Sequence, residues 1–312
     1  MTVRDDVALL VDGGVPALGG GDTPDRWERL HTWARTGSVS AARLAEAHVD
    51  AQSIIEEAGC SASDVSDALY GVWASGGPGS GPTFDRRSGT ITGIKPFASG
   101  VGVVDRALVT VDDEEGGTWL VEVDLAPAST WYQSSDRWAT PALAHTATGE
   151  TTFRKHPVVR VVGGDGWYLR RPGFWHGAVG PAACWGGATA GLVDLVDRDQ
   201  TQDPHRLRAR GAMRAEASGV LALLRWAAEA ADRSFDDLQE AQYRAIAVRS
   251  LIERSCTRTV DEFARAWGPR PFVTDESTAQ RVADIQLYVR QHHGDVDLVA
   301  LGSLPSLSED SR

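Results

Sequence analysis

The chain has 312 residues, of which 42% are hydrophobic and 24% charged. This balance is typical of a globular protein and excludes the disordered, collagen-like and coiled-coil classes. Because 43 acidic residues outweigh 31 basic ones and give a net charge of −12, a broad electrostatic grip on nucleic acid or anionic lipid is disfavoured. The expected partner is a small molecule or another subunit.

The three cysteines, Cys60, Cys184 and Cys256, lie far apart in the sequence and form no CxxC pair. They predict neither a disulfide framework nor a cysteine zinc site, and they favour a reducing, cytoplasmic environment. The N-terminal segment has one basic residue before two aspartates, so it fails as a signal peptide. No stretch reaches the roughly 20 uninterrupted apolar residues of a membrane span, and we therefore expect a cytoplasmic protein that binds no membrane.

The N-terminal region has the periodicity of helices. Between residues 24 and 59, apolar and small residues recur at three- and four-residue steps. Gly37 and Ser38 interrupt this pattern, and a serine at such a turn can cap the helix that follows. We expect a pair of helices that ends at Gly59, within an N-terminal helical domain over 1–66.

The middle of the sequence has the residue pattern of β-strands. Short β-branched or aromatic runs alternate with segments rich in glycine, proline, aspartate or serine. Six such runs without intervening helices predict an antiparallel barrel or sandwich rather than a βαβ nucleotide fold, in a domain over 67–168. The predicted strands are 68–74, 90–97, 106–111, 119–123, 148–153 and 158–162.

Helical periodicity returns in the last part of the chain. Four helices with short connections predict a bundle over 169–312, and the first of them is rich in glycine and alanine, which lets neighbouring backbones approach closely. The fold class is therefore α+β, with N-terminal helices, a middle antiparallel β barrel and a C-terminal four-helix bundle. The predicted bundle helices are 176–198, 207–231, 235–267 and 275–293.

Two strings and this order of elements resemble the acyl-CoA dehydrogenase superfamily. The first string is ITGIKPFASGVGVVDRALVTV at 91–111, and it is similar to a family strand motif of glycine, lysine, an aromatic and a serine or threonine. The second is GPRPFVTDESTAQRVADIQLYVRQHHGDVDLVALG at 268–302, and it is similar to the terminal helix region of smaller family members and related flavin monooxygenases. The resemblance implies the three-part fold and bound FAD.

The resemblance also implies which residues contact the cofactor. The aromatic strand motif corresponds to Phe97, Ala98 and Ser99, where a ring and a hydroxyl can contact the isoalloxazine. Alternatively, Phe97 is a core aromatic and Ser99 belongs to a turn. The segment 71–82 takes the place of a second flavin-facing strand but lacks the family's threonine-glutamate and serine-aspartate pairs. Further cofactor candidates are Trp73, Ala74, Ser75, Arg281 and Arg290.

Acyl-CoA dehydrogenases require a glutamate base, and the bundle sequence offers no obvious equivalent. The nearest candidates are His292, His293 and Asp295, and His176 is the next choice. An imidazole at this place can act as a base or as a hydrogen-bond donor in the oxygen chemistry of a reduced flavin. Alternatively, the two histidines only mark the end of a helix, and His176 is structural.

The resemblance implies an FAD-dependent oxidoreductase that carries out α,β-dehydrogenation of an acyl thioester or related small substrate. A flavin-dependent monooxygenase on the same fold is the first alternative, and a non-catalytic binding or scaffold relative is the second. Family members assemble as dimers or tetramers, so we expect a homo-oligomer with the glycine-rich helix at 176–191 in its interface. No HExxH or similar spacing is present, so no metal site is expected.

Overall fold

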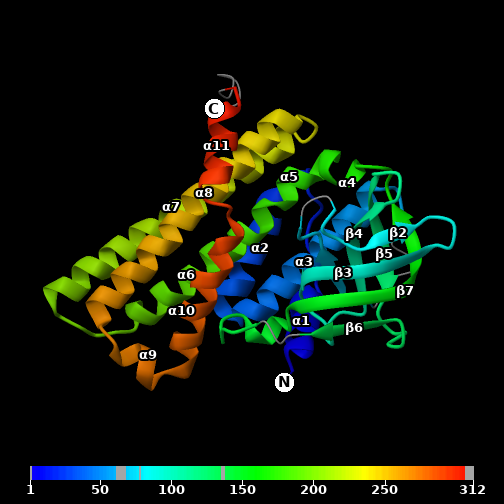
Figure 1. Cartoon of the computed structure of the whole chain (residues 1–312). Coiled ribbons are helices and arrows are strands. Elements are labelled where there is room, and N and C mark those ends of the chain that lie inside the picture. Colours follow the sequence, from blue (N-terminus) through cyan, green and yellow to red (C-terminus); the bar gives the residue numbers. More distant parts are fainter. Residues whose placement is uncertain (1, 61–67, 77–78, 135–137, 306–312) are drawn as a thin grey trace. The chain divides into compact units, whose positions relative to one another are not determined.

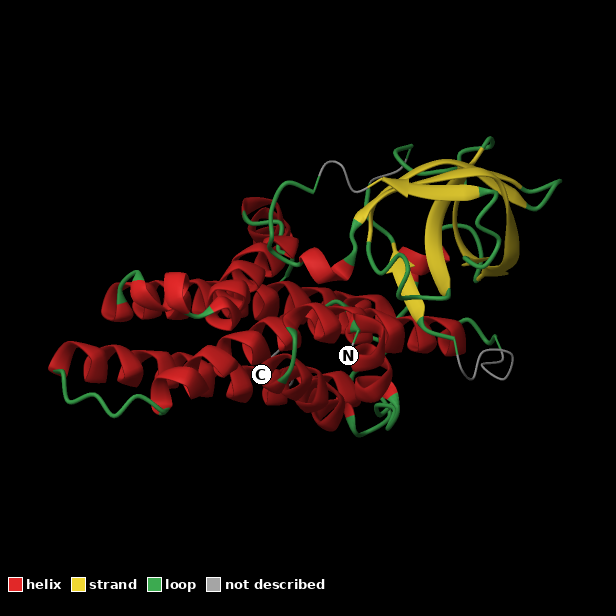
Figure 2. Ribbon diagram, turned by 90° about the horizontal axis from the view of Figure 1, so that it is seen from below, coloured by secondary structure: helices red, strands yellow, loops and turns green. Residues whose placement is uncertain are grey.

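The computed structural model describes residues 2–60, 68–76, 79–134 and 138–305 (Figure 1). Contacts within the chain divide it into two compact units. We call them the β unit, which contains residues 1–14, 44–140 and 144–174, and the helical unit, which contains residues 15–43, 141–143 and 175–312. In Figure 2 the strands of the β unit are yellow and all helices are red.

The contacts assign the N-terminal region to both units. Residues 1–14 belong to the β unit, residues 15–43 belong to the helical unit, and the chain then returns to the β unit at Leu44. The three domains expected from the sequence stay a prediction, and the expected boundary after residue 66 lies outside the described residues.

The β unit contains the barrel that the sequence predicts. The sheet order is β1-β4-β2-β3-β7-β5, and a further pairing of β4 with β5 closes the last five of these strands into a ring. A shorter strand, β6, pairs with β7. The strands are β1 (Tyr70–Trp73), β2 (Thr83–Asp85), β3 (Thr90–Ala98), β4 (Arg106–Asp113), β5 (Thr118–Asp124), β6 (Trp131–Ser134) and β7 (Gly149–Val162).

Several strands differ from the sequence-based prediction. The two runs predicted at 148–153 and 158–162 are one long strand, β7, while β2 and β6 are three and four residues long and are too short to give a clear period. The barrel is also not wholly antiparallel, because β1 and β2 both pair in parallel with β4. The antiparallel hairpin of β2 and β3 explains the parallel pairing of β2, since β4 reverses the direction of β3 again.

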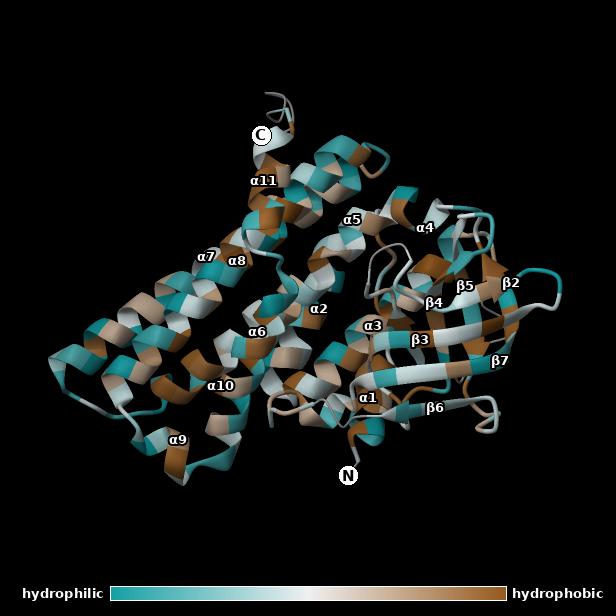
Figure 3. Cartoon of the chain, viewed as in Figure 1, coloured by the Kyte–Doolittle hydropathy of each residue, from teal (hydrophilic) through white to brown (hydrophobic). Residues whose placement is uncertain are grey.

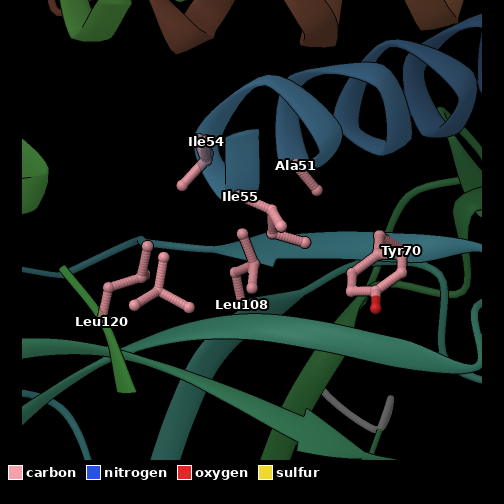
Figure 4. Packing of buried hydrophobic residues seen from close by; sticks show 7 residues of the cluster. Ala51, Ile54, Ile55, Tyr70, Leu108 and Leu120 are labelled. Atoms are coloured by element: carbon pink, nitrogen blue, oxygen red, sulfur yellow. The ribbon is translucent and has the colours of Figure 1, made fainter. Parts of the chain in front are cut away.

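One face of α3 (Val39–Glu57) supplies apolar side chains to the core of the β unit. Ala51, Ile54 and Ile55 follow helical spacing, and they cluster with buried side chains from four strands (Figure 4). At the N-terminus, α1 (Val3–Val11) is fixed to the same unit by Arg4, whose guanidinium pairs with Asp105 at 2.9 Å. The strand members of the cluster are Tyr70, Leu108, Leu120 and Val162.

The helical unit contains the four predicted bundle helices, which are thereby confirmed. Along α7 and α8, hydrophilic and hydrophobic residues alternate (Figure 3), as expected for amphipathic helices. The bundle helices are α6 (Val179–Asp197), α7 (Pro204–Arg233), α8 (Leu238–Trp267) and α10 (Glu276–Tyr288), preceded in the chain by α2 (Thr23–Thr36). The short elements are η2 (Ala144–Thr146), α4 (Trp167–Arg170), α5 (Gly173–Gly177), α9 (Arg270–Thr274), η3 (Val289–Gln291) and α11 (Asp295–Ser303).

The glycines of α6 allow a close approach to α2. A Cβ on Gly187 would lie 1.9 Å from the carbonyl oxygen of His31, which is a backbone atom that cannot move aside. Gly186 and Gly191 likewise face side-chain or backbone atoms at less than van der Waals distance. The small residues of this helix thus serve packing inside one chain, with most of α6 buried.

The burial of α6 corrects one expectation. The sequence-based reason for placing 176–191 in a subunit interface was its small residues, but those residues contact helices of the same unit. Homo-oligomerisation itself stays a prediction. The segment Gly173–Asp197 is also long and apolar enough to cross a membrane, yet 78% of its apolar window is buried, as in the core helix of a globular unit. The cytoplasmic location remains a prediction.

Candidate functional site

Strand β3 ends in a bulge that turns an aromatic ring outward. Its pairing with β7 shifts between Lys95 and Ala98, so that the strand gains one extra residue there. Phe97 lies in this bulge with φ of +53°, and the residue is 66% exposed. Without the bulge, strand alternation would point Phe97 to the same side as Lys95, which is buried. The irregular backbone therefore places the ring on the surface.

Hydrogen bonds hold the backbone on both sides of Phe97. The indole Nε1 of Trp73 donates to the Ser99 carbonyl at 2.8 Å, and the Ser75 hydroxyl donates to the Pro96 carbonyl at 2.5 Å. The Ala98 carbonyl accepts from the side-chain amide of Gln133 at 3.1 Å. Trp73 and Ala98 are buried. The structure thus places Trp73 and Ser75 as supports of the bulge.

A row of hydroxyls lies beside the bulge. Ser99 Oγ is 2.8 Å from Thr148 Oγ1, which is in turn 2.7 Å from Thr146 Oγ1. The N–H of Gly100 donates to the Thr146 carbonyl at 2.7 Å, which fixes the end of β3 to this segment. Thr146 and Thr148 are buried, so the exposed ring and the half-buried Ser99 hydroxyl are the groups that fit a flat heteroaromatic cofactor with a polar rim. Thr148 carried no sequence signal, because it comes from a distant strand region.

Lys95 is a buried amine in the same strand. Its Nζ donates to the carbonyl oxygen and to the hydroxyl of Thr110, at 3.1 and 2.7 Å. Burial lowers the pKa of this amine to about 8, and the charge of Asp112 opposes that shift. Lys95 therefore links β3 to β4 inside the barrel, whereas the side chain of Phe97 is exposed two residues later.

His292 lies in the helical unit directly after η3, and its imidazole is 5% exposed. Its Nε2 is 2.8 Å from the Ser250 hydroxyl and 3.6 Å from an Asp297 carboxylate oxygen. Its Nδ1 accepts the N–H of Gly294 at 3.1 Å. Burial holds the pKa of His292 below its usual range, while Asp297 acts in the opposite direction. Within this cluster His292 is a neutral imidazole.

The other terminal candidates are more exposed. The His293 imidazole is 3.2 Å from Asp297, which also accepts the backbone N–H of His293 at 3.0 Å. Burial acts to raise the pKa of Asp297, but these hydrogen bonds outweigh it and hold the pKa below its usual range. Asp295 lies exposed in the first turn of α11. His292, His293 and Asp297 therefore form one group.

The remaining candidates of the helical unit make structural contacts. The His176 ring is buried and stacks on Phe235 with 4.7 Å between ring centroids. Arg281 donates to the carbonyls of Ala34, Ala188 and Gly37, and so joins α2 to α6. The guanidinium of Arg290 pairs with Glu253 at 2.5 Å on the surface.

The candidates thus fall into two sets, one on each unit. The β unit carries Phe97 and Ser99, and the helical unit carries the group around His292. Among the residues that the structure describes, no set of three or more histidines, cysteines or carboxylates has the geometry of a metal site.

No known family model matches the sequence, and no curated protein does so either. Solved structures do match. TdsC, a dibenzothiophene monooxygenase from Paenibacillus sp. A11-2 solved with indole, has a TM-score of 0.79 at 15% identity, covering 98% of this chain and 89% of TdsC. Butyryl-CoA dehydrogenase from Megasphaera elsdenii has a TM-score of 0.74 at 16% identity, covering 91% of this chain and 82% of that enzyme.

A third similar structure is the methanesulfinate monooxygenase MsuC from Pseudomonas fluorescens. Its TM-score is 0.74 at 16% identity, and the match covers 98% of this chain and 90% of MsuC. Dehydrogenases and monooxygenases thus both occur among the similar structures. Identities this low establish the fold and leave the reaction open. The chain has the fold of the acyl-CoA dehydrogenase superfamily, as the two sequence strings implied.

Proposed function

We propose that the chain is a flavin-dependent oxidoreductase that acts on a small molecule. The observation that carries this proposal is the outward-facing ring of Phe97 in a left-handed backbone conformation. Such a conformation costs a non-glycine residue about 1–2 kcal/mol and is enriched at functional sites, and of the four such residues that the structure describes (Phe97, Leu143, Ala147 and Lys155) Phe97 is the one with an exposed aromatic ring. An exposed aromatic ring also loses the burial that normally favours it. Both costs are explained if the ring contacts an isoalloxazine.

The neighbouring groups support a flavin at this place. The half-buried Ser99 can offer a hydroxyl to its polar rim while the buried Thr148 holds that hydroxyl from behind, and the supports from Trp73 and Ser75 keep the strand end rigid. TdsC and KijD3, which share the fold, were solved with FMN. FMN is therefore a candidate beside the FAD that the sequence resemblance implied, and the shared part of both cofactors is what the bulge would contact.

A bound flavin supplies either hydride transfer or the activation of oxygen. For dehydrogenation the protein must add a carboxylate base against the substrate. The Asp297 carboxylate is engaged by the backbone and side chain of His293, so its low pKa makes it a weak base. The His292 imidazole, whose two nitrogens contact Ser250 and Gly294, does not supply that base either. We therefore favour monooxygenation over dehydrogenation.

Dehydrogenation of an acyl thioester is the second candidate. The observation in its favour is Asp295, whose exposed carboxylate lies in the first turn of α11, two residues after the histidine pair in the chain. A non-catalytic scaffold is the third reading, and it requires that the chain binds no flavin.

Flavin binding is the first test. The visible spectrum of the purified protein, taken before and after incubation with FMN or FAD and removal of free cofactor, should show about one flavin per chain. Ser99→Asp should abolish this occupancy, because the new carboxylate would be placed beside the ring and a buried hydroxyl. Ser99→Ala is the matched control and should retain most of the flavin. Full occupancy in Ser99→Asp contradicts the assignment of this surface.

Turnover then separates the two reactions. To test monooxygenation, the protein is incubated with a flavin reductase, oxygen and a candidate substrate, and product is measured. The candidates are the compounds named for similar proteins: indole, dibenzothiophene and methanesulfinate. Anaerobic bleaching of bound flavin by butyryl-CoA tests dehydrogenation. Oxygen-dependent product that disappears in His292→Ala supports the favoured reaction, whereas bleaching by the thioester alone would replace it with the second candidate. A colourless protein that binds neither FMN nor FAD would support the third reading, a non-catalytic scaffold.

A further inference from the structure

The hydrogen bonds of His292 define where its proton lies. The backbone N–H of Gly294 donates to Nδ1 at 3.1 Å, so Nδ1 must offer a lone pair. A neutral imidazole has one proton, which therefore belongs to Nε2. Burial keeps the ring neutral and the cationic Arg249 acts in the same direction, while Asp297 and Glu253 oppose them. His292 is thus an Nε2–H donor.

Ser250 supplies the acceptor for that proton. Its hydroxyl lies 2.8 Å from Nε2 and is also 2.7 Å from the carbonyl oxygen of Ile246, one turn earlier in α8. Because the carbonyl can only accept, the hydroxyl proton goes to Ile246 and the oxygen lone pair faces His292. Ser250 is buried, so this arrangement is shielded from water.

The preceding residue of α8 holds the backbone next to His292. Arg249 donates to the carbonyl of Gln291 at 2.8 Å and to the carbonyl of Ala178 at 2.5 Å, and its guanidinium lies 4.7 Å from the centre of the Trp185 ring. One cation therefore joins the start of α6, the middle of α8 and the residue before His292. A planar guanidinium suits this role because it donates in fixed directions while it stacks.

We propose that Arg249 and Ser250 are positioning residues that hold His292 in the Nε2–H form: Arg249 fixes the backbone before the imidazole, and Ser250 fixes the ring itself. This inference rests on the proposed function for its catalytic meaning. The chemical consequence is that the buried ring keeps one tautomer and one orientation, because both of its nitrogens are engaged. A displacement of about 1 Å within a site can change a rate by about 10²-fold.

The test of positioning needs neither flavin nor substrate. In protein labelled with [15N]histidine, NMR should show slowly exchanging Nε2 protons for the buried imidazoles, and the one signal that His292→Gln removes belongs to His292. Ser250→Ala should speed the exchange of this proton with water at least about tenfold or mix the tautomers, because the N–H loses its acceptor. Ser250→Thr keeps a hydroxyl and should restore the wild-type signal.

Controls on the same helix separate positioning from a general loss of stability. Ser255→Ala removes a buried serine hydroxyl that donates to the Glu216 carbonyl at 3.5 Å, and it should leave the His292 signal unchanged. Arg249→Met keeps an apolar contact with Trp185 but loses both carbonyl contacts, and it should also speed proton exchange. Arg258→Lys changes an exposed ion pair with Glu216 and should leave the rate of proton exchange at His292 unchanged.

Two results overturn the proposal: a wild-type His292 with its proton on Nδ1, or an exchange rate in Ser250→Ala within about twofold of wild type. Turnover tests the proposed function separately. If the enzyme is active, Ser250→Ala should lower kcat by about tenfold to a hundredfold and Ser250→Thr should recover it. If the protein binds no flavin, the proposed function is contradicted. The NMR measurement still tests whether Arg249 and Ser250 position His292.

Discussion

The two units carry their candidate sites in different ways. In the β unit, Phe97 lies near the end of β3 and Ser99 directly follows that strand, and the bulge that exposes the ring is confined to β3 and its partner β7. In the helical unit, His292 depends on Ser250, which is 42 positions earlier in the chain. The first site is thus visible in a continuous string, whereas the second exists only where α8 meets the segment after η3. Variants that disturb packing should therefore affect the helical unit most.

Close packing of α6 against α2 gives the largest expected effect. Gly187→Ala would place a methyl group 1.9 Å from the His31 carbonyl oxygen, and the free energy of unfolding should fall by about 3 kcal/mol or more. Gly211→Ala is the matched control in α7, where no atom lies within 4 Å of the new Cβ. It should raise stability by about 1 kcal/mol through helix propensity. Equal effects of both variants in denaturant titrations would contradict the packing argument.

Buried histidines should make both units sensitive to acid. Burial lowers the pKa of His31 in the helical unit and of His48 in the β unit to about 4 in each case. In the unfolded chain each histidine binds a proton near pH 6.5. The contribution of the neutral, buried ring to the free energy of unfolding is therefore fully present above about pH 6.5 and is lost as the pH falls towards about 4. Each histidine should contribute up to about 3 kcal/mol to this loss.

Glutamine substitutions separate the two histidines. His48 Nδ1 accepts the N–H of Tyr70 at 3.0 Å, and a glutamine carbonyl can replace that acceptor, whereas His31 Nε2 has no hydrogen-bond partner. His48→Gln and His31→Gln should both reduce the loss of unfolding free energy between about pH 7 and about pH 4.5, and His31→Gln should cost less at neutral pH. An unchanged pH dependence in both variants would show that these rings do not titrate as described.

Substitutions in the bulge should have the smallest effect on stability, and they test flavin binding most directly. Phe97→Gly relieves the left-handed conformation of a side-chain-bearing residue, but glycine is less ordered in the unfolded chain, so stability should rise by at most about 1 kcal/mol. Flavin affinity should fall about tenfold because the ring contact is lost. Phe97→Ala keeps the strained backbone and should lose affinity without gaining stability. Wild-type affinity in Phe97→Gly would remove Phe97 from the site.

The sequence predicted much of the architecture and part of the site. Periodicity located all four bundle helices and most of the barrel strands, because amphipathic period is a local property. It missed β2 and β6, which are too short to show a period, and it divided β7 in two. The cofactor contact expected of Trp73 stays a prediction, and the sequence did not indicate that its buried indole donates to the Ser99 carbonyl. Whether Phe97 and Ser99 bind flavin stays a proposal.

By itself, the sequence determined the order of helices, barrel and bundle, the resemblance to acyl-CoA dehydrogenases, and the string that contains Phe97. These features depend on residues that are neighbours in the chain or recur at a fixed period. Only the tertiary structure decided that Phe97 faces outward, that α6 packs inside its own unit, and that Arg249 and Ser250 contact the segment of His292. Those outcomes depend on which distant segments meet, and no local pattern specifies the partner of a buried polar group.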